Sequence, residues 1–478
     1  MKRSALFLHA IFLLIMPGQA FAADLKVAAD GSAQFDTIQS AIDSTVNGDR
    51  VIVADGEYKG DKNKDIDFQG KAITVMSERG PENCIIDCEK SGRAFIFYHN
   101  ETETSVVSGF TIKNANTADG GAIRCGKYNP GDIYTPPKAT EEKGSPTISN
   151  CVFTDNNTDY AGAAIIINTS DPIIKDCRFD KNKAKHYGGG IAFMNTSNPK
   201  IINCSFTNNS AYSGGAIHAE ESKGELVGLY VADNFTTTNG VPPGYDGGGI
   251  CIRKSETNIE RCTILRNKSY WGAGISVKIN SSSKIESCLI AENEGQRGGG
   301  IAVRKSNASI YGCTITGNSA PGGNNPFEGI GGIYDEEVGP EIANSIIWGN
   351  ANGQIGADKD ETYPSIKYSN VEGGYVGTGN IDSDPLFTGG GDYHVTPDSP
   401  CLGTGNAENA PTYDLDNKVR AEDGIYTMGA YEEPKVGGKD SPGKASSSSS
   451  SGCFINTAAK FFDFNQIKKS LLAFPIFQ

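Results

Sequence analysis

Hydrophobic and polar positions recur along the middle of the chain with a period of about 26 residues. The pattern is Ile, two residues, Cys, one residue, a large apolar residue, two residues and Asn. The Cys position is filled in eight successive copies by Cys151, Cys177, Cys204, Leu229, Cys262, Cys288, Cys313 and Ser345. The Asn position is filled in the same copies by Asn156, Asn182, Asn209, Asn234, Asn267, Asn293, Asn318 and Asn350. A second marker, a run of small residues ending in Ile, separates the copies at Ile123, Ile165, Ile191, Ile217, Ile250, Ile275, Ile301 and Ile333.

A repeat of this length predicts one coil of a single-stranded right-handed parallel β-helix, with three short strands and three turns in each coil. Stacked coils lie about 4.8 Å apart, so the same position of successive coils falls in one line. Phe153, Phe179 and Phe206 should then stack in the interior. The Asn of each copy should adopt the left-handed turn conformation and hydrogen-bond to the Asn of the next coil. The fold class predicted is therefore all-β.

The segment before the repeats reads FDTIQSAIDSTVNGDRVIVADGEYKG over residues 35–60, and weaker coils such as AITVMSE and VVSGFTIKN follow it. These segments and the repeats resemble the pectin-lyase-like β-helix proteins. The resemblance implies an N-terminal capping helix that covers the open edge of the first coil. Its apolar face is expected to contain Thr37, Ile38, Ala41, Ile42 and Val46. About eleven coils over residues 23–343 would form a rod of roughly 50 Å.

Residues 1–22 have the pattern of a secretory signal. Lys2 and Arg3 precede the apolar run ALFLHAIFLLIM, and the small-residue sequence AFA provides a cleavage site. The pattern predicts export to the cell surface or the medium, with the periplasm as an alternative. An uncleaved membrane anchor is the other interpretation, although the apolar run is short for a span. No later stretch is long and apolar enough to cross a bilayer.

The C-terminal segments also have recognisable patterns. Residues 344–432 contain NSIIWGN, DSDPLF, DLDN and MGAYE, and they resemble the choice-of-anchor-type module of exported bacterial β-helix proteins, which implies a C-terminal cap. The DSD and DLDN sequences favour Asx turns, with Ca²⁺ binding as the alternative. Residues 433–452 form a Ser-rich flexible linker. Residues 453–478 begin CFINTAAKFF and resemble a Cys-Phe-Ile sorting tail, although that family usually has Ala at the position of Asn456.

Charge and cysteine content narrow the possible functions. A net charge of −14 argues against nucleic acid as a partner. Twelve cysteines in an exported protein would ordinarily suggest disulfides. The Cys positions of the repeat, however, should stack with parallel Cα–Cβ directions, which disfavours bridging. We therefore expect buried thiols that pack as small hydrophobic side chains. No CxxC pair or Cys/His cluster points to zinc, so we predict no metal ligands.

One face of the predicted helix carries candidate chemistry. The Ile of the second marker should point inward, so the residues one and three positions later should point outward. The third positions are Asn168, Met194, Glu220, Arg253, Lys278, Arg304 and Glu336. Three successive coils therefore place Arg253, Lys278 and Arg304 about 5 Å apart. Like charges at this spacing repel unless an anionic group lies across them.

Further cations and aromatic rings accompany this stripe. Lys254 and Lys305 follow in the twin motifs IRKS and VRKS, and His218 occupies a first outward position. Tyr245, Tyr270 and Trp271 lie in the turns beside the small-residue runs. Aromatic rings next to basic groups suit a chain of sugar acids, because the rings stack on sugar faces and the cations pair with carboxylates.

The resemblance implies a polysaccharide as partner, because the corresponding face of these proteins often binds polysaccharide. We expect a non-catalytic, adhesin-like glycan-binding protein. The residues expected to contact glycan are Glu220, Arg253, Lys254, Lys278, Arg304, Lys305, Tyr245, Tyr270 and Trp271.

The alternative is a polysaccharide lyase acting on uronates. Arg253 or Arg304 would neutralise the carboxylate, Lys278 would remove the C5 proton, and Tyr270 or His218 would protonate the leaving oxygen. A third interpretation is a solvated face whose cations pair with Glu220, Glu221 and Glu336.

Overall fold

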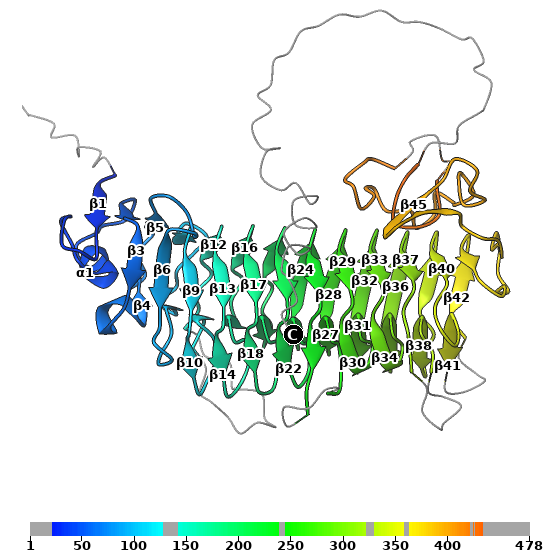
Figure 1. Cartoon of the computed structure of the whole chain (residues 1–478), viewed down its shortest axis with the longest axis horizontal. Coiled ribbons are helices and arrows are strands. Elements are labelled where there is room, and N and C mark those ends of the chain that lie inside the picture. The colour runs from blue at the N-terminus through cyan, green and yellow to red at the C-terminus, as the bar shows by residue number, and fades with distance from the viewer. Residues whose placement is uncertain are drawn as a thin grey trace, which may run out of the picture. The chain divides into compact units, whose positions relative to one another are not determined.

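The computed structural model describes residues 22–127, 142–238, 244–321, 329–357, 363–420, 424 and 426–433. The predicted signal segment, Ser-rich linker and sorting tail lie outside the described residues, apart from Ala22 and Glu433. Clustering of contacts divides the chain between residues 435 and 436. All described residues belong to the first unit, which is a stack of parallel β-coils (Figure 1).

Three long parallel sheets run along the stack. Sheet A contains β1 (Asp24–Val27), β2 (Arg50–Val53), β5 (Thr74–Ser77), β8 (Val106–Ser108), β12 (Thr147–Ser149), β16 (Ile173–Lys175), β20 (Lys200–Ile202), β24 (Lys223–Val227), β28 (Glu256–Glu260), β32 (Ser282–Glu286), β36 (Asn307–Tyr311), β39 (Glu341–Ala343) and β42 (Ser365–Lys367). Sheet B contains β3 (Gly56–Tyr58), β6 (Cys84–Asp87), β9 (Thr111–Lys113), β13 (Val152–Thr154), β17 (Arg178–Asp180), β21 (Ser205–Thr207), β25 (Tyr230–Ala232), β29 (Thr263–Leu265), β33 (Leu289–Ala291), β37 (Thr314–Thr316), β40 (Ile346–Trp348) and β43 (Asn370–Val371). Sheet C contains β4 (Ile66–Asp67), β7 (Phe95–Phe97), β11 (Ile123–Cys125), β15 (Ile165–Asn168), β19 (Ile191–Met194), β23 (Ile217–Glu220), β27 (Ile250–Arg253), β31 (Ile275–Lys278), β35 (Ile301–Arg304), β38 (Ile333–Glu336) and β41 (Ile355–Ala357). The all-β parallel β-helix predicted from the repeat is confirmed.

A fourth sheet of seven short strands, which the sequence analysis did not anticipate, lies between sheets B and C in the middle coils. Sheet D contains β10 (Asn116–Thr117), β14 (Asn157–Thr158), β18 (Lys183–Ala184), β22 (Ser210–Ala211), β26 (Phe235–Thr236), β30 (Lys268–Trp271) and β34 (Glu294–Arg297). These coils therefore have four strands rather than the expected three. At the corner after sheet B the chain passes through one left-handed residue, such as Asp155 (φ 54°), and is extended again from Asn157.

The Asn ladder stabilises this corner. The ladder Asn residues were expected to adopt the left-handed conformation themselves, and the structure corrects this. The left-handed residue is the one before each Asn, as at Lys181 (φ 56°) before Asn182. The ladder side chains themselves are buried and bond from coil to coil as predicted. Nδ2 of Asn182 donates to Oδ1 of Asn209 at 2.9 Å, and the backbone N–H of Asn182 donates to the same oxygen at 3.0 Å. Each buried amide in the ladder is thereby hydrogen-bonded, which removes the cost of burying it.

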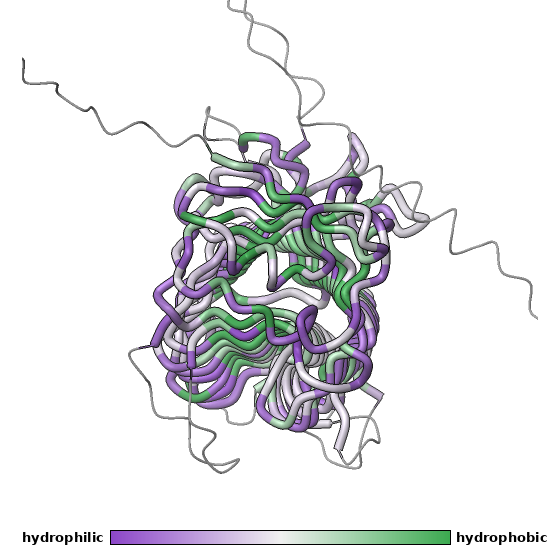
Figure 2. Tube along the Cα trace, turned by 90° about the vertical axis from the view of Figure 1, so that its left-hand side faces the viewer, coloured by the Kyte–Doolittle hydropathy of each residue, from purple (hydrophilic) through white to green (hydrophobic). Residues whose placement is uncertain are grey.

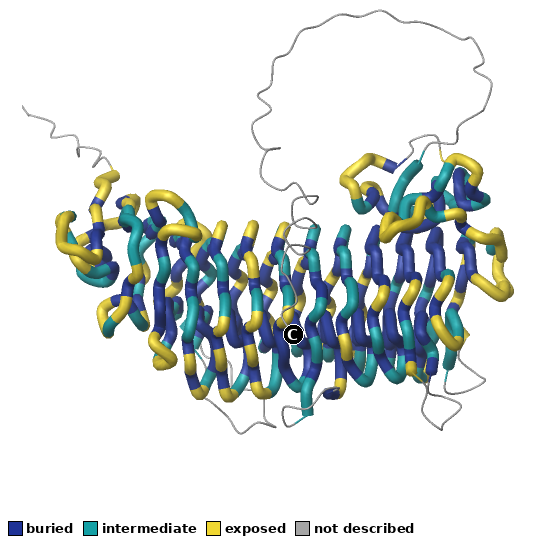
Figure 3. Tube along the Cα trace, in the orientation of Figure 1, coloured by how far each residue is buried: buried dark blue, intermediate teal, exposed yellow. Residues whose placement is uncertain are grey.

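The interior is a column of stacked apolar side chains. Phe153, Phe179 and Phe206 stack in parallel with ring centroids 4.9 and 4.5 Å apart. Figure 2 shows the hydrophobic residues lining the inside of the coils, and Figure 3 shows buried residues in every layer. The eleven cysteines that the structure describes are buried and free, as predicted for the stacked positions.

A short helix closes the first coil. Helix α1 (Ile38–Asp43) buries Ile38, Ala41 and Ile42 against the interior, and the 3-10 helix η1 (Asp61–Asn63) lies beside it. Val46, expected on the apolar face of the helix, lies beyond its end and is 62% exposed. The helix ends early because Ser44 and Thr45 turn the chain toward β2.

The residues after the last coils fold back onto sheet B. The parallel pairing continues to β43, so the coils reach into the residues assigned to the C-terminal module. The antiparallel hairpin of β44 (Phe387–Gly389) and β45 (Asp392–Val395) follows. Ser287 Oγ donates to the carbonyl of Tyr413 at 2.6 Å, and the N–H of Ala430 donates to Thr314 Oγ1 at 2.9 Å. These bonds join the module to the outer face of sheet B.

Candidate functional site

The outer edge of sheet C brings the predicted charged ladder together. The fourth residues of its strands pair in register in the order Asn168, Met194, Glu220, Arg253, Lys278, Arg304 and Glu336. Because the sheet is parallel and in register, Arg253, Lys278 and Arg304 lie on adjacent strands. The spacing of the repeat predicts this juxtaposition.

Carboxylates of the chain pair with the cations of the ladder, and one of these carboxylates was not predicted. Asp246, which was not among the predicted site residues, bonds to Lys278 Nζ at 2.5 Å and to Arg304 Nη1 at 2.9 Å. Glu336 accepts a second hydrogen bond from Arg304 at 2.9 Å, and Glu220 pairs with Arg253. The anionic groups that lie across the cations therefore belong to the protein. The third interpretation expected cations of this face to pair with Glu220, Glu221 and Glu336, and the structure contains those three pairs.

Asp246 reaches the ladder from the segment that precedes the small-residue run. In each coil, one residue of this segment forms an isolated β-bridge with the equivalent residue of the next coil. In coil order these residues are Ala161, Tyr187, Ser213, Asp246 and Trp271. The chain then turns sharply through glycine. Gly188 has φ +58°, and a Cβ on it would meet the carbonyl oxygen of Ile191 at 2.1 Å. The bridging side chains consequently fold over the outer face of sheet C.

Lys254 and Lys305 lie apart from this network. Each occupies a left-handed corner just after its strand, with φ values of 49° and 51°. Lys254 pairs with Glu221 at 2.7 Å, and Lys305 pairs with Glu337 at 3.4 Å. Both pairs are substantially exposed, so they contribute little to stability.

Aromatic rings pack against the cations. The guanidinium of Arg304 lies 3.9 Å from the ring centroid of Trp271, and that of Arg297 lies 4.6 Å from it. Trp271 also makes an edge contact with Tyr334 at 5.5 Å. The two guanidinium groups hold the indole in place through cation–π attraction.

Tyr245 and Tyr270 flank this packed group. Tyr245 contacts Tyr212 with ring centroids 5.2 Å apart and remains 50% exposed. Tyr270 lies 5.6 Å from Trp271. Tyr245 is therefore the aromatic side chain at this site with the most surface available to a ligand.

A groove of about 350 Å³ opens at this position. It is lined by Tyr245, Asp246, Trp271, Lys278, Ile279, Arg304, Lys305 and Glu336. Five of the candidates thus share one concave surface. Arg253, Lys254, Tyr270, His218 and Glu220 do not line it.

The side chain of His218 is buried, although it lies on the outward side of its strand in sheet C. The bridging segment covers it: Ser213 Oγ lies 3.3 Å from its Nδ1, and the ring of Tyr187 lies 4.6 Å away. Its Nε2 lies 3.3 Å from Glu220 Oε2. The expectation that His218 is exposed on this face is wrong, because the covering segment removes it from solvent.

Lys278 is held in its charged form. Burial alone would favour the neutral amine, but the negative charges of the Cys251 thiolate form and of the Asp246 carboxylate raise the pKa of Lys278 above its ordinary value. An amine that keeps its proton at neutral pH cannot act as a general base. This argues against the role that a lyase would require of Lys278.

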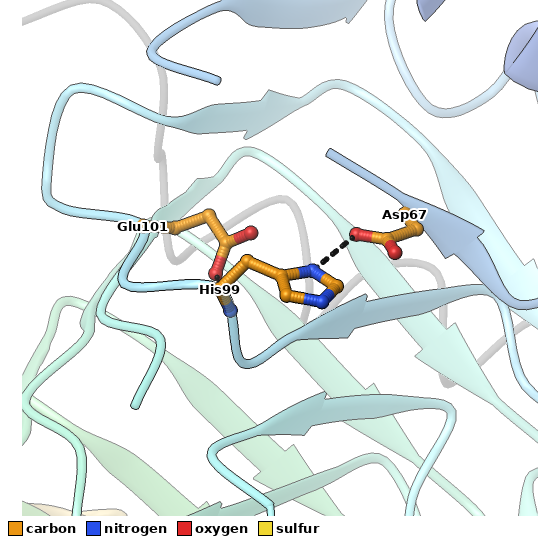
Figure 4. Close-up of side chains that lie close together, drawn as sticks. All are labelled: Asp67, His99 and Glu101. Carbon is orange, nitrogen blue, oxygen red and sulfur yellow. Dashed lines mark hydrogen bonds and ion pairs between the residues drawn. The ribbon is translucent and has the colours of Figure 1, made fainter. Parts of the chain in front are cut away.

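A second group of titratable side chains lies near the N-terminal end of sheet C (Figure 4). Asp67, His99 and Glu101 have atoms close enough to hold a metal ion, and His99 Nδ1 lies 3.2 Å from Asp67 Oδ1. Glu101, however, accepts backbone N–H bonds from Gly70 and His99, both at 2.9 Å. Its carboxylate is buried and closes a turn, so the structure gives it a structural role.

The acidic motifs of the C-terminal module are engaged in turns. Asp384 accepts the N–H of Leu386 at 2.9 Å. Asp414 accepts the N–H groups of Lys418 and Glu432 at 2.7 and 2.9 Å. The bond to Asp384 has the two-residue spacing of an Asx turn, whereas the bonds to Asp414 come from residues 4 and 18 positions further along the chain.

Comparison with known proteins agrees with the architecture. The family described as "Right handed beta helix region" matches residues 62–240 and 248–380. No curated protein matches the chain by sequence. No helix among the described residues is long and apolar enough to span a membrane.

Comparison with solved structures gave several matches. The structure of XylC with xylose has a TM-score of 0.50 at 10% identity, covering 86% of this chain and 98% of that one. The pectate lyase Pel9A has a TM-score of 0.43 at 10% identity, covering 87% and 97%. A PL6 alginate lyase in complex with a trisaccharide has a TM-score of 0.38 at 13% identity, covering 86% and 95%. At 10% identity, the similarity to the XylC structure shows the fold alone.

Proposed function

Because this chain belongs to the right-handed β-helix family, whose coils present side chains in lines along one face, we propose that the groove on sheet C binds a carbohydrate chain without cleaving it. We propose further that the protein is exported and acts at the cell surface or in the medium, as the pattern of residues 1–22 suggests.

The observation that carries this proposal is the exposed ring of Tyr245 beside the ion-paired Asp246, Lys278 and Arg304. An aromatic face next to fixed charged hydrogen-bonding groups suits a sugar, which has an apolar ring face and a rim of hydroxyls. Ion-paired side chains keep their direction, so they can bond hydroxyls with little loss of side-chain entropy. The balanced charges also allow the ligand to be neutral.

The alternative, a lyase acting on uronates, has less support from the geometry. β-Elimination needs an unprotonated base and an accessible proton donor. Lys278 is charged and His218 is fully buried. Arg253 and Arg304, the candidates to neutralise a carboxylate, already pair with carboxylates of the chain.

Binding of the mature chain to a panel of neutral and acidic polysaccharides tests the proposal. Tyr245→Ala should weaken binding about tenfold, or about 1.4 kcal/mol. The matched control is Tyr363→Ala, since Tyr363 is 64% exposed but does not line the groove. Equal binding by the two variants, or no binding by the parent to any member of the panel, would overturn the proposal.

The same samples distinguish binding from cleavage. Pectate, alginate, chondroitin and hyaluronan are incubated with the parent, with and without Ca²⁺, and ultraviolet absorbance is followed. We expect a flat trace. An increase that reports unsaturated uronate would identify a lyase instead.

A further inference from the structure

Aromatic side chains occupy the same chain position in five successive coils that include the groove. The position directly precedes the residues that form the isolated β-bridges beside sheet C. We call its occupants the corner aromatic ladder, and in coil order they are Tyr160, His186, Tyr212, Tyr245 and Tyr270. Only Tyr245 of this set lines the groove. The groove therefore does not account for the other four.

Backbone hydrogen bonds place the members of the ladder in adjacent coils. The N–H of His186 donates to the carbonyl of Tyr160 at 3.0 Å, and the N–H of Tyr245 donates to that of Tyr212 at 3.3 Å. The N–H of Ser213 donates to the carbonyl of His186 at 2.9 Å. The last step follows from the isolated bridge between the next two residues of its coils. Adjacent coils lie about 4.8 Å apart, so the five positions span about 19 Å along the stack.

The rings of the ladder are partly exposed and are held by neighbouring side chains. Tyr245 is 50% exposed, and the other four have intermediate exposure. The ring centroids of Tyr160 and His186 lie 6.3 Å apart, and those of Tyr212 and Tyr245 lie 5.2 Å apart. Tyr160 also packs against a buried apolar cluster that contains Ile166. Rings held in this way lose little side-chain entropy when a ligand binds.

The ladder carries no net charge. Burial lowers the pKa of His186, so its imidazole is neutral at neutral pH. The residues directly before the ladder positions include one acid and one base, and they are Asp159, Lys185, Ala211, Gly244 and Ser269. In the groove, Lys278 and Arg304 are paired with Asp246. The surface thus offers rings and hydroxyl groups without the excess of cations that a chain of sugar acids would require.

The ladder has a defined length. In the coil before Tyr160, no aromatic residue occurs between Thr117 and Ile123. In the coil after Tyr270, Gln296 occupies the ladder position, because the next residues of the two coils pair in register. The aromatic surface therefore covers five coils and ends on both sides.

We propose that the corner aromatic ladder extends the groove into a track for a neutral, linear polysaccharide whose chain runs along the stack, across the coils. This inference rests on the proposed function, because the groove at Tyr245 forms part of the track. The spacing of the rings, about 4.8 Å, is comparable with the length of one sugar unit in an extended chain. Each ring can stack on a sugar face, and the phenol hydroxyls and the imidazole can bond to sugar hydroxyls. A chain lying across the stack at a right angle would meet only one of these residues.

Binding of oligosaccharides of increasing length to the mature chain tests the proposal. Cello-, manno-, xylo- and laminari-oligosaccharides from disaccharide to hexasaccharide are titrated by calorimetry, with oligogalacturonates as the acidic comparison. For at least one neutral series, affinity should increase about tenfold or more between the disaccharide and the hexasaccharide, as rings beyond the groove become engaged.

The possible failures are distinguishable. No binding by any series would overturn the proposed function together with this inference. Binding that does not strengthen beyond the disaccharide, or that occurs with the oligogalacturonates only, would leave carbohydrate binding in place and overturn the track.

A substitution outside the groove locates the track. Tyr160 lies three coils from Tyr245, and Tyr160→Ala should reduce the ratio of hexasaccharide to disaccharide affinity about fivefold. If that variant does not fold, His186→Ala provides the same test. The control is Tyr363→Ala, an exposed tyrosine outside the ladder, which should leave the ratio unchanged. An unchanged ratio in the ladder variant would overturn the proposal.

A second copy of the chain is the other possible occupant of an exposed aromatic surface. Sedimentation equilibrium of the parent and of Tyr160→Ala distinguishes the two. We expect the same mass for both proteins. Self-association that disappears in the variant would assign the ladder to a protein interface and overturn the proposal.

Discussion

Asp246 Oδ1 accepts a hydrogen bond at 2.9 Å from Arg304, which lies 58 residues further along the chain. The other oxygen of the same carboxylate accepts a bond from Lys278. One side chain from the bridging segment therefore ties together two successive strands of sheet C. The arrangement allows cations to occupy adjacent positions of a parallel ladder, where they would otherwise repel each other.

Asp246→Asn should destabilise the protein by about 3 kcal/mol. The substitution removes the negative charge and leaves Lys278 and Arg304 close together with one fewer counter-charge in a largely buried site. The change in unfolding free energy is measured by denaturant titration. Glu221→Gln is the matched control: it breaks the exposed pair with Lys254 and should cost less than about 1 kcal/mol. Equal costs for the two variants would contradict this account of the network.

The repeat predicted the register of sheet C residue by residue. Counting three positions from Ile250, Ile275 and Ile301 was enough to place Arg253, Lys278 and Arg304 on adjacent strands. This worked because a parallel ladder with a fixed coil length converts sequence spacing directly into spatial position.

The chemistry of the site was less accessible from the sequence. Asp246 lies one residue before a glycine run, at a position filled by Ala, Tyr, Ser and Trp in other coils, so no repeated residue type marks it. Its reach over two strands depends on the sharp turn through glycine. The same turn buries His218, which alternation alone would have placed in solvent. The sequence feature that could have identified Asp246 is that it is the single acidic residue between Tyr245 and the glycines of YDGGGI.

Asn209→Ala should cost about 3 kcal/mol or more. Oδ1 of Asn209 accepts two bonds from Asn182, and its Nδ2 donates to Phe179 and Asn234. Truncation leaves several buried groups without partners, and each costs about 1 kcal/mol or more. Thermal and denaturant unfolding measure the loss.

The control for the ladder is Asn157→Ala, one residue beyond the ladder position of another coil. Asn157 is exposed, and its side chain bonds only to the carbonyl of Asp155 among the described residues. We expect a change of less than about 0.5 kcal/mol. A comparable loss from both substitutions would show that the ladder does not stabilise the fold in this way.

Asp335→Asn should stabilise the protein at neutral pH. Asp335 faces the interior beside Val303, its Oδ1 has no hydrogen-bond partner among the described residues, and burial raises its pKa from 3.8 to about 6. A carboxyl with a raised folded-state pKa binds its proton more tightly when folded. Stability therefore falls as pH increases from about 4 to 6.

The size and pH dependence of this effect provide the test. Denaturation of the parent and the Asp335→Asn variant at pH 4 and pH 7.5 should show a difference of about 2 kcal/mol only at the higher pH. The hydrogen bond from Gly339 N–H to the side chain survives, because the amide oxygen can replace the carboxylate oxygen. An equal difference at both pH values would point to packing rather than to ionisation.

The C-terminal module should become less stable as the pH increases above neutrality. His394 lies between Asp392, 2.6 Å from Nδ1, and Asp416, 3.0 Å from Nε2. Burial opposes its charge, but hydrogen bonds to Asp416 and Asp392 raise the pKa of His394 above 6.5. Its contribution to stability is fully present below pH 6.5 and disappears as pH increases through the higher folded-state value. Hydrogen exchange of β44 and β45, corrected for intrinsic rates, should accelerate between pH 6 and pH 9 in the parent. In His394→Gln the corrected rates should be faster at pH 6 and nearly independent of pH; a pH response that persists in the variant would assign the effect to another group.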